Sequence, residues 1–162
     1  MQSLLYQQID AALEQKIVAR FGEWVVKHRC LHFEPGSYSL AAVVDGEPVG
    51  FISTYPGRFP APLEGLGDAY IDVIEVDAGY RRMGIARTLI AMTEEWASDF
   101  GYRQIRAWSS QDKQEAIPMW NALDYCMCPA KIWVEWCKEV VDGYYVAKRL
   151  TYGKPAENLA GG

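Results

Sequence analysis

The most informative segment of the chain is Val76-Asp77-Ala78-Gly79-Tyr80-Arg81-Arg82-Met83-Gly84-Ile85-Ala86. It follows an apolar segment, Ala69–Val76, that is predicted to be a central strand, and it precedes a segment with apolar residues at helical spacing. The start of a helix exposes backbone N–H groups and carries a partial positive charge, so it favours a bound anion. Gly84 has no Cβ and can adopt a positive φ, which lets a phosphate approach the backbone. The stretch therefore predicts a strand, a phosphate-binding turn and a helix.

Side chains around this turn strengthen the prediction of an anion site. Arg81, Arg82 and Arg87 add positive charge, and Ala86 is small. The alternative is a solvated basic turn that binds nothing. Other phosphate motifs do not fit, because the chain has neither Gly-x-x-x-x-Gly-Lys-Ser/Thr nor Gly-x-Gly-x-x-Gly after a strand.

Beyond the turn, the apolar spacing predicts a helix from Gly84 to about Phe100, which ends at Gly101. A strand, a short helix and an antiparallel pair of strands are expected to follow, and the pair is joined by a turn at Asp142-Gly143. These elements span Tyr102–Ser109, about Glu115–Leu123, Tyr125–Trp136 and Tyr144–Thr151.

Before the turn, Asp10 is a plausible N-cap for a helix that reaches about His28. Two strands joined at Asp45-Gly46 follow, and then a loop rich in Pro and Gly that we expect to face substrate. These segments span Ser37–Val44, Val49–Tyr55 and Pro56–Asp68. Strands with inserted helices indicate an α/β or α+β protein with a sheet of mixed direction.

Length and composition favour one globular domain, expected over residues 1–152, with a frayed tail over residues 153–162. Apolar residues make up 50 % of the chain and charged residues 23 %, which is typical of globular proteins. The formal net charge of −5 provides no basic field for nucleic acid or anionic lipid. Because we see no long apolar run and no secretion signal, we expect no membrane association and a cytoplasmic location.

Cysteine and histidine spacing does not indicate a metal site. None of the four cysteines forms a C-x-x-C pair, which makes a zinc or redox role improbable. His28 and His32 are four residues apart, and we interpret them as ordinary residues at the end of a helix. We therefore expect no metal.

In its order of elements and in two motifs, the chain resembles the GNAT superfamily of acyl-coenzyme A-dependent N-acyltransferases. The likeness covers about residues 37–125 and is most specific over Val76–Ile90 and Ala116–Tyr125. It implies a mixed, mostly antiparallel sheet of six or seven strands that is splayed beside the central strand. It also implies that backbone N–H groups of Arg82–Ala86 bind the coenzyme A pyrophosphate and that an N–H near Glu75 polarises the thioester carbonyl.

The same resemblance implies that the pantetheine arm pairs with the central strand as an added strand would. It assigns cofactor binding to Ile74, Val76, Arg81, Arg82, Met83, Gly84, Ile85, Ala86, Arg87 and Trp120.

Two carboxylates of the central strand, Asp72 and Glu75, are candidates for the base that deprotonates an acceptor amine. Strand alternation places them on opposite faces unless a bulge intervenes. We favour Asp72, which by alternation shares a face with Tyr70 and Ile74. The alternative is that both carboxylates only bind arginines of the neighbouring strand, Arg103 or Arg106.

The acid that protonates the departing thiolate is less evident. Trp120 occupies the position where the family usually has a Tyr, and an indole N–H is no acid near neutral pH. We interpret Trp120 as a wall of the tunnel for the thiol. The thiolate would leave unassisted or be protonated by another residue, namely Lys113, Tyr125, Tyr144 or Tyr145.

The resulting hypothesis is an N-acetyltransferase that uses acetyl-coenzyme A. A primary amine of a small molecule or peptide would attack the thioester directly in a ternary complex, and a homodimer is one assembly that the chain could form. The alternative hypothesis, motivated by Trp120, is a non-catalytic acyl-coenzyme A sensor or interaction module.

Overall fold

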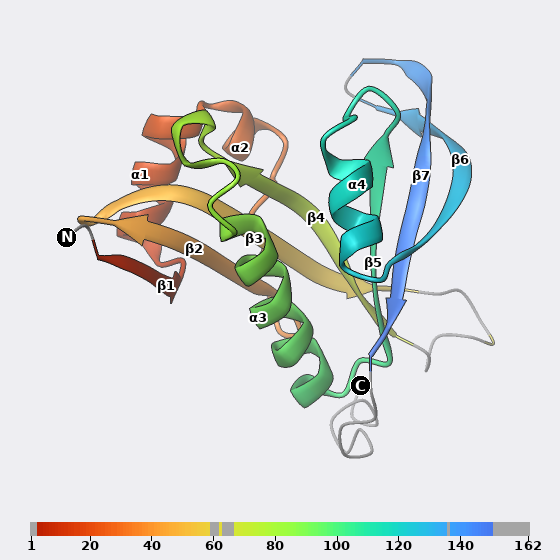
Figure 1. Cartoon of the computed structure of the whole chain (residues 1–162), viewed down its shortest axis with the longest axis horizontal. Coiled ribbons are helices and arrows are strands. Elements are labelled where there is room, and N and C mark those ends of the chain that lie inside the picture. Colours follow the sequence, from red (N-terminus) through yellow and green to blue (C-terminus); the bar gives the residue numbers. More distant parts are fainter. Residues whose placement is uncertain (1–2, 59–61, 63–66, 136, 151–162) are drawn as a thin grey trace.

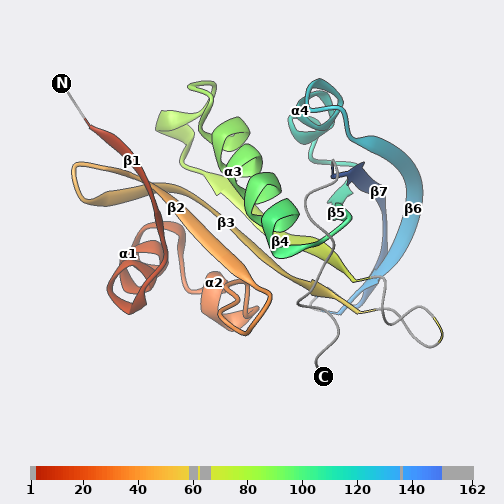
Figure 2. The same cartoon turned by 90° about the horizontal axis from the view of Figure 1, so that it is seen from below.

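The computed structural model describes residues 3–58, 62, 67–135 and 137–150 of the chain. These residues form a seven-stranded sheet in the order β1-β2-β3-β4-β5-β7-β6, with helices on both faces (Figures 1 and 2). The arrangement confirms the expected mixed, mostly antiparallel sheet. The expected tail at residues 153–162 and part of the predicted substrate-facing loop at residues 56–68 lie outside the described residues.

The elements after residue 36 agree closely with the predicted ones, apart from the last two strands. The strands are β1 (Leu4–Gln8), β2 (Tyr38–Val44), β3 (Glu47–Gly57), β4 (Asp68–Val76), β5 (Gln104–Ser110), β6 (Cys126–Val134) and β7 (Glu139–Arg149). The helices are α1 (Ala11–Phe21), α2 (Trp24–Lys27), α3 (Ile85–Phe100) and α4 (Ala116–Ala122), with a 3-10 turn η1 (Ala78–Tyr80).

The N-terminal region differs from the prediction in two ways. Asp10 caps α1 as expected, because its carboxylate accepts a hydrogen bond from the Leu13 N–H at 2.8 Å. The single helix expected to reach His28 is wrong, however: Gly22 adopts a φ of +110°, and α1 ends before it. The chain also begins with β1, an unpredicted edge strand whose mostly exposed residues show no alternating apolar pattern.

The two central strands, β4 and β5, run parallel over a short distance and then separate. Their pairing extends only from Ala69–Ile105 to Ile71–Ala107, and beyond this point both strands continue without pairing to each other. Figure 1 shows them separating toward their carboxyl ends. We call the point at Ile71 and Ala107 the fork. It confirms the splay expected beside the central strand.

A β-bulge lies at the fork. The register between β3 and β4 shifts so that Thr54 faces Ile71 and Ser53 faces Val73, which leaves Asp72 as the extra residue. After the bulge, Ile74 packs with Ile71 and Val76 in the core on the α3 side. Glu75 pairs with Phe51, which belongs to the core on the α1 side. Simple alternation, which placed Ile74 on the face of Asp72, therefore does not hold across this strand.

Two apolar cores lie on the two faces of the sheet, and they are covered by different helices (Figure 2). Helices α3 and α4 cover the larger core, and α1 and α2 cover the smaller one. Leu89, Ile90 and Ile105 are fully buried in the larger core, and Ile17 and Phe51 are fully buried in the smaller one. Both faces of the central strands are thus buried, which explains their nearly continuous apolar sequence.

The turn predicted at Asp142-Gly143 is wrong, because both residues lie inside β7. A Cβ at Gly143 would lie 2.4 Å from the Ser109 carbonyl oxygen and 2.6 Å from the Trp108 ring. This glycine therefore permits β5 and β7 to approach closely, and it marks no turn. The chain instead reverses between Val134 and Glu139, where Lys138 adopts a φ of +55°.

Candidate active site

The predicted phosphate turn, Asp77–Ala86, follows β4 directly and leads into α3. Asp77 caps η1, since its carboxylate accepts from the Gly79 N–H at 2.9 Å and pairs with Arg20 Nε of α1 at 2.9 Å. The Gly79 N–H bond is the main cause that lowers the pKa of Asp77. Asp77 therefore holds the start of the turn by two interactions, a hydrogen bond with the backbone and an ion pair with a separate helix.

The second half of the turn presents free backbone donors. Arg82 and Gly84 both have positive φ values, +63° and +81°, and Gly84 is the N-cap residue of α3. In the described part of the chain, no protein group accepts a hydrogen bond from the N–H groups of residues 82–87. A Cβ at Gly84 would have no atom within 4 Å, so the backbone there is open to a ligand. The turn has the donors and the space that an anion needs.

The side chains of the turn differ in what they contact. Arg81 is held by the protein, because its guanidinium donates to the Val76 carbonyl at 3.1 Å and lies 3.3 Å from Glu75 and 3.5 Å from Glu115. Met83 is exposed, and Ile85 is buried in the larger core. Arg81 thus fixes the end of β4, whereas the backbone around Gly84 provides the anion-binding donors.

Beyond the fork, the β5-facing edge of β4 carries no paired strand. Ile74 and Val76, the residues assigned to the pantetheine arm, lie on this segment and pair with β3 on its other edge. An extended ligand can form backbone hydrogen bonds along such an edge. The edge runs from the fork to the phosphate turn, so the two expected cofactor contacts are continuous.

A groove lies on the face of the sheet opposite α3, at the end of β4. It has a volume of about 500 Å³ and is bounded by α1, the end of β4 and the β5–α4 connection. Glu75 and Lys113 line it together with Arg20, Trp24 and Arg81. This groove brings one candidate base and one candidate acid to the same region.

The two candidate bases have partners other than Arg103 and Arg106, which the alternative interpretation named. Asp72 Oδ2 lies 2.7 Å from His32 Nε2, and Glu75 Oε1 lies 3.3 Å from Arg81 Nη2. Arg106 instead forms an ion pair with the fully buried Asp68 at the first residue of β4.

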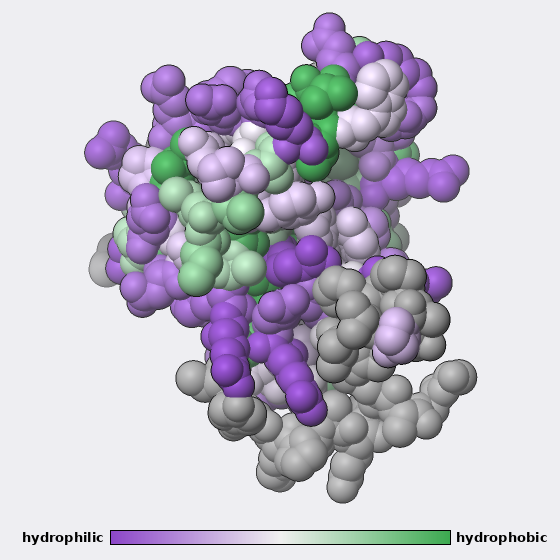
Figure 3. Space-filling view, turned by 90° about the vertical axis from the view of Figure 1, so that its right-hand side faces the viewer, coloured by the Kyte–Doolittle hydropathy of each residue, from purple (hydrophilic) through white to green (hydrophobic). Residues whose placement is uncertain are grey.

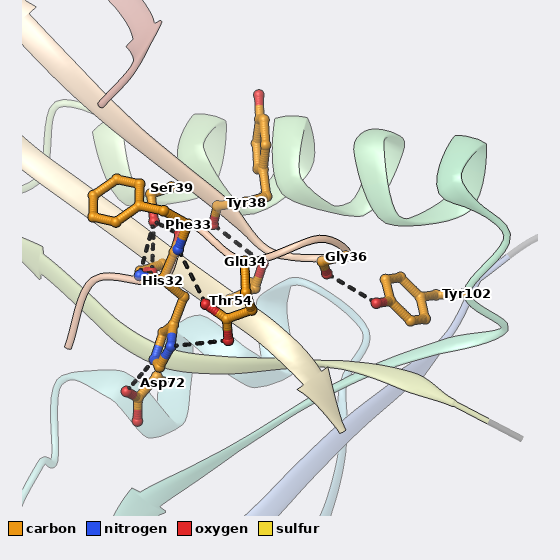
Figure 4. Close-up of polar contacts among 10 residues, drawn as sticks. His32, Phe33, Glu34, Gly36, Tyr38, Ser39, Thr54, Asp72 and Tyr102 are labelled. Atoms are coloured by element: carbon orange, nitrogen blue, oxygen red, sulfur yellow. Dashed lines mark hydrogen bonds and ion pairs between the residues drawn. The ribbon is translucent and has the colours of Figure 1, made fainter. Parts of the chain in front are cut away.

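His32 is the site residue that the sequence interpretation missed. It lies after α2 in the loop that leads to β2, and Figure 4 shows its ring between Asp72 and Glu34. Its backbone N–H is held by Ser53 Oγ at 3.0 Å, and its ring lies 4.7 Å from the Tyr55 ring. The hydrogen bond that the His32 ring donates to the Asp72 carboxylate is the main cause that raises the pKa of His32, and it outweighs the opposing effect of burial. The residues around His32 in the sequence do not indicate that Asp72, which is 40 residues further along the chain, is its partner.

Tyrosines continue this surface across the sheet toward β5. Tyr55 and Tyr70 are neighbours on β3 and β4, with ring centroids 5.2 Å apart, and Tyr70 is paired in turn with Arg106. The Arg106 guanidinium lies over the Tyr70 ring. The face opposite α3 therefore presents histidine, carboxylate and aromatic groups beside the fork.

The candidate acids are distributed over both faces. Trp120 is buried in the larger core, and its indole N–H has no hydrogen-bond partner among the described residues. The Tyr125 hydroxyl donates to Glu94 at 2.9 Å, and burial is the main cause that raises its pKa, which makes Tyr125 a poor acid for a thiolate elsewhere. Tyr144 packs against the larger core beside β5, while Lys113 lines the groove.

The comparison with family models identifies the family of the chain. The model of the acetyltransferase (GNAT) family matches residues 5–125, which is most of the chain. The chain belongs to the GNAT family. No curated protein matches the sequence.

Solved GNAT structures share the fold at low sequence identity. The ribosomal-protein-alanine N-acetyltransferase from Brucella melitensis superposes with a TM-score of 0.71 and 18 % identity, over 90 % of this chain and 99 % of that one. Arabidopsis thaliana NAA60, solved in complex with acetyl-CoA, gives a TM-score of 0.68 and 18 % identity, over 91 % and 99 % of the two chains. An N-acetyltransferase from Staphylococcus aureus Mu50 gives 0.71 and 15 %, over 92 % and 99 %.

The described residues contain neither a metal-binding group nor a helix suited to crossing a membrane. No group of three or more His, Cys, Asp or Glu residues in them is arranged to hold a metal ion. None of their helices combines the length and the apolar character that a membrane crossing requires.

Proposed function

We propose that this GNAT protein is an N-acetyltransferase that transfers an acetyl group from acetyl-coenzyme A to a primary amine of a small molecule or peptide. The observation that carries the proposal is the phosphate turn, where the unpaired N–H groups of residues 82–87 surround an open Gly84. These donors would hold the pyrophosphate, with Arg82 and Arg87 adding charge, and the free edge of β4 would hold the pantetheine arm.

The acceptor would approach the fork from the face opposite α3, where the candidate bases Asp72 and Glu75 lie. Its neutral nitrogen attacks the acetyl carbon directly, so that a C–N bond forms and, as the tetrahedral intermediate collapses, the C–S bond breaks. A backbone N–H near Glu75 would stabilise the oxygen of that intermediate. The departing thiolate takes a proton, for which Tyr144, the exposed Tyr145 and Lys113 in the groove are the candidates.

Binding of coenzyme A tests the proposed cofactor site. We expect isothermal titration to detect binding to the wild type and to show at least a 10-fold weaker affinity for Gly84→Glu, because the new carboxylate repels phosphate. Gly46→Glu is the matched control, since Gly46 has nearly the same φ, +82°, and equally open surroundings but lies in the β2–β3 hairpin. Coenzyme A binding that is absent, or equal in the two variants, would contradict the proposal.

The second candidate function is a coenzyme-binding sensor without turnover, which the buried Trp120 favours. Thiol release from acetyl-coenzyme A distinguishes the two functions when it is measured with spermidine, kanamycin, L-lysine and a peptide that has a free N-terminal amine. An enzyme releases thiol faster with at least one of these amines, whereas a sensor binds the coenzyme and releases none.

A homodimer is a further part of the proposal. The β6–β7 hairpin exposes the cross-strand neighbours Trp133 and Val140, and Figure 3 shows apolar areas among hydrophilic side chains on this side of the molecule. Multi-angle light scattering of the wild type and of Trp133→Lys tests this assembly. A wild-type mass of about 18 kDa, that of the chain itself, would contradict it.

A further inference from the structure

His32 and Asp72 form a close polar pair on the proposed acceptor face of the fork. The Nε2–Oδ2 distance of 2.7 Å is typical of a charge-assisted hydrogen bond. The two side chains come from separate segments, and each is partly accessible, at 19 % and 33 % exposure. The Tyr55 ring lies beside the imidazole, and hydrogen bonds with Ser39 and Ser53 hold the His32 backbone.

The position of Asp72 links this pair to the proposed chemistry. Asp72 is the bulge residue directly after the last β4–β5 pair, at the point where the strands separate. From here to Val76 the free edge of β4 extends four residues, or about 13 Å, toward the phosphate turn. A cofactor bound at the turn and extended along this edge directs its acyl end to the fork, so the pair lies where an acceptor nitrogen has to arrive.

Glu34 completes the arrangement on the second ring nitrogen. Its Oε1 lies 3.5 Å from His32 Nδ1, and the three side chains are seen together in Figure 4. When the Nε2 hydrogen is donated to Asp72, the neutral ring keeps its lone pair on Nδ1, beside Glu34. Two carboxylates therefore flank the ring, one beside each nitrogen, and their negative charge favours a cationic amine close to Nδ1, which can accept a proton.

We propose that His32, oriented by Asp72, is the catalytic base for the acceptor amine and that Glu34 attracts the ammonium form of that amine. This inference rests on the proposed acetyltransferase function and makes Asp72 a positioning residue. The ammonium gives one proton to Nδ1, and its nitrogen then attacks the acetyl carbon. As the C–S bond breaks, the second proton passes to the thiolate. Ammonium and thioester thus yield amide, thiol and one proton, which His32 returns to water.

The dependence of the rate on pH tests this role. With the best amine of the panel, kcat of the wild type is expected to rise with pH through the pKa of His32. The titratable side chains beside the ring are Asp72, Glu34 and Tyr55, whose own ring lies 4.7 Å away. The two carboxylates raise the pKa of His32 above the ordinary value of about 6.5. His32→Gln is expected to lower kcat about 100-fold or more and to remove the inflection. Asp72→Asn is expected to move the inflection to lower pH.

Histidine NMR provides a readout that does not require turnover. The chain contains two histidines, so His32→Gln assigns both ring signals, and His28→Gln serves as the matched control for rate and folding. The His32 signal is expected to titrate above the ordinary histidine pKa of about 6.5 in the wild type, and Asp72→Asn should lower this pKa. Coenzyme A affinity should stay unchanged in all three variants.

The possible failures are distinguishable. If the wild type acetylates an amine but His32→Gln keeps its rate and inflection, the proposed function stands and the base is another group. If His32→Gln loses rate and coenzyme A affinity equally at every pH, His32 has a structural role, and the inference is overturned. A His32 titration that does not respond to Asp72→Asn would also overturn it. Absence of both turnover and coenzyme binding in the wild type would instead refute the proposed function and, with it, this inference.

Discussion

His32 illustrates how a contact between distant segments changes the role of a residue. In the sequence it is one of two histidines near the end of a predicted helix, but Gly22 breaks that helix and the following loop carries His32 to β4. There Asp72 and Glu34 favour its protonated form. A side chain with this environment couples the stability of the loop to pH.

We expect His32→Gln to destabilise the protein more at pH 5.5 than at pH 9. The raised pKa in the folded state means that the protonated imidazole contributes its stability fully below about pH 6.5, and that the contribution is lost as pH rises through the folded pKa. Urea denaturation at both pH values measures the difference. His28→Gln is the control, and a loss for His32→Gln that is equal at both pH values would contradict the coupling.

At the level of elements, the separation of β4 and β5 depends on how the strands around it are held. The buried Asp68–Arg106 pair joins β4 to β5 at the paired end, and Arg81 holds the far end of β4 through the Val76 carbonyl. On the other side, β5 is held by β7, whose Gly143 allows close contact with Trp108 and Ser109. The fork is therefore supported on both sides by specific side chains and by one glycine.

We expect Gly143→Ala to destabilise the protein by roughly 1–3 kcal/mol, which is typical of overpacking. The added Cβ would meet the Ser109 carbonyl oxygen at 2.4 Å, and a backbone atom cannot move aside as a flexible side chain can. Urea denaturation measures the loss, and Gly67→Ala is the control, because its Cβ would meet its nearest atom at an ordinary 3.7 Å. Equal stability of the two variants would show that β5 and β7 separate at little cost.

In the molecule as a whole, the sheet divides the interior into two cores. Ile90 is fully buried under α3 on one face, and Ile17 is fully buried under α1 on the other. The larger core underlies the proposed cofactor side, and the smaller one underlies the proposed acceptor side. The same sheet therefore supports two surfaces whose packing is largely independent.

We expect Ile17→Val and Ile90→Val each to cost about 0.5–1.5 kcal/mol, since each removes one buried methylene group. Because the two residues belong to separate clusters, the double variant should equal the sum of the single effects within about 0.5 kcal/mol. Chemical denaturation of the four proteins measures this. A larger deviation would indicate that the sheet transmits strain between its faces.

The elements that the sequence predicted correctly have local signals. The helix α3 follows from its apolar spacing and its flanking glycines, and the turn before it follows from Gly84 after an apolar strand. The predicted hairpin turn was wrong because the same dipeptide occurs in turns and at close contacts between strands. Asp142-Gly143 is typical of a hairpin turn, yet Gly143 is required inside β7 by the Trp108 ring and the Ser109 backbone. The turn motif could not reveal a contact with another strand.

The family, the sheet class and the strand, turn and helix around Gly84 could be predicted from the sequence, because helix starts, glycine conformation and apolar periodicity depend on residues close together in the chain. The partner of each polar group became known only from the folded chain. The bulge at Asp72, the Glu75–Arg81 contact and the arrival of His32 from another loop all arise from packing between distant segments. Candidate bases can therefore be named from a sequence, but their orientation and their hydrogen-bond partners are set by residues that folding brings close to them.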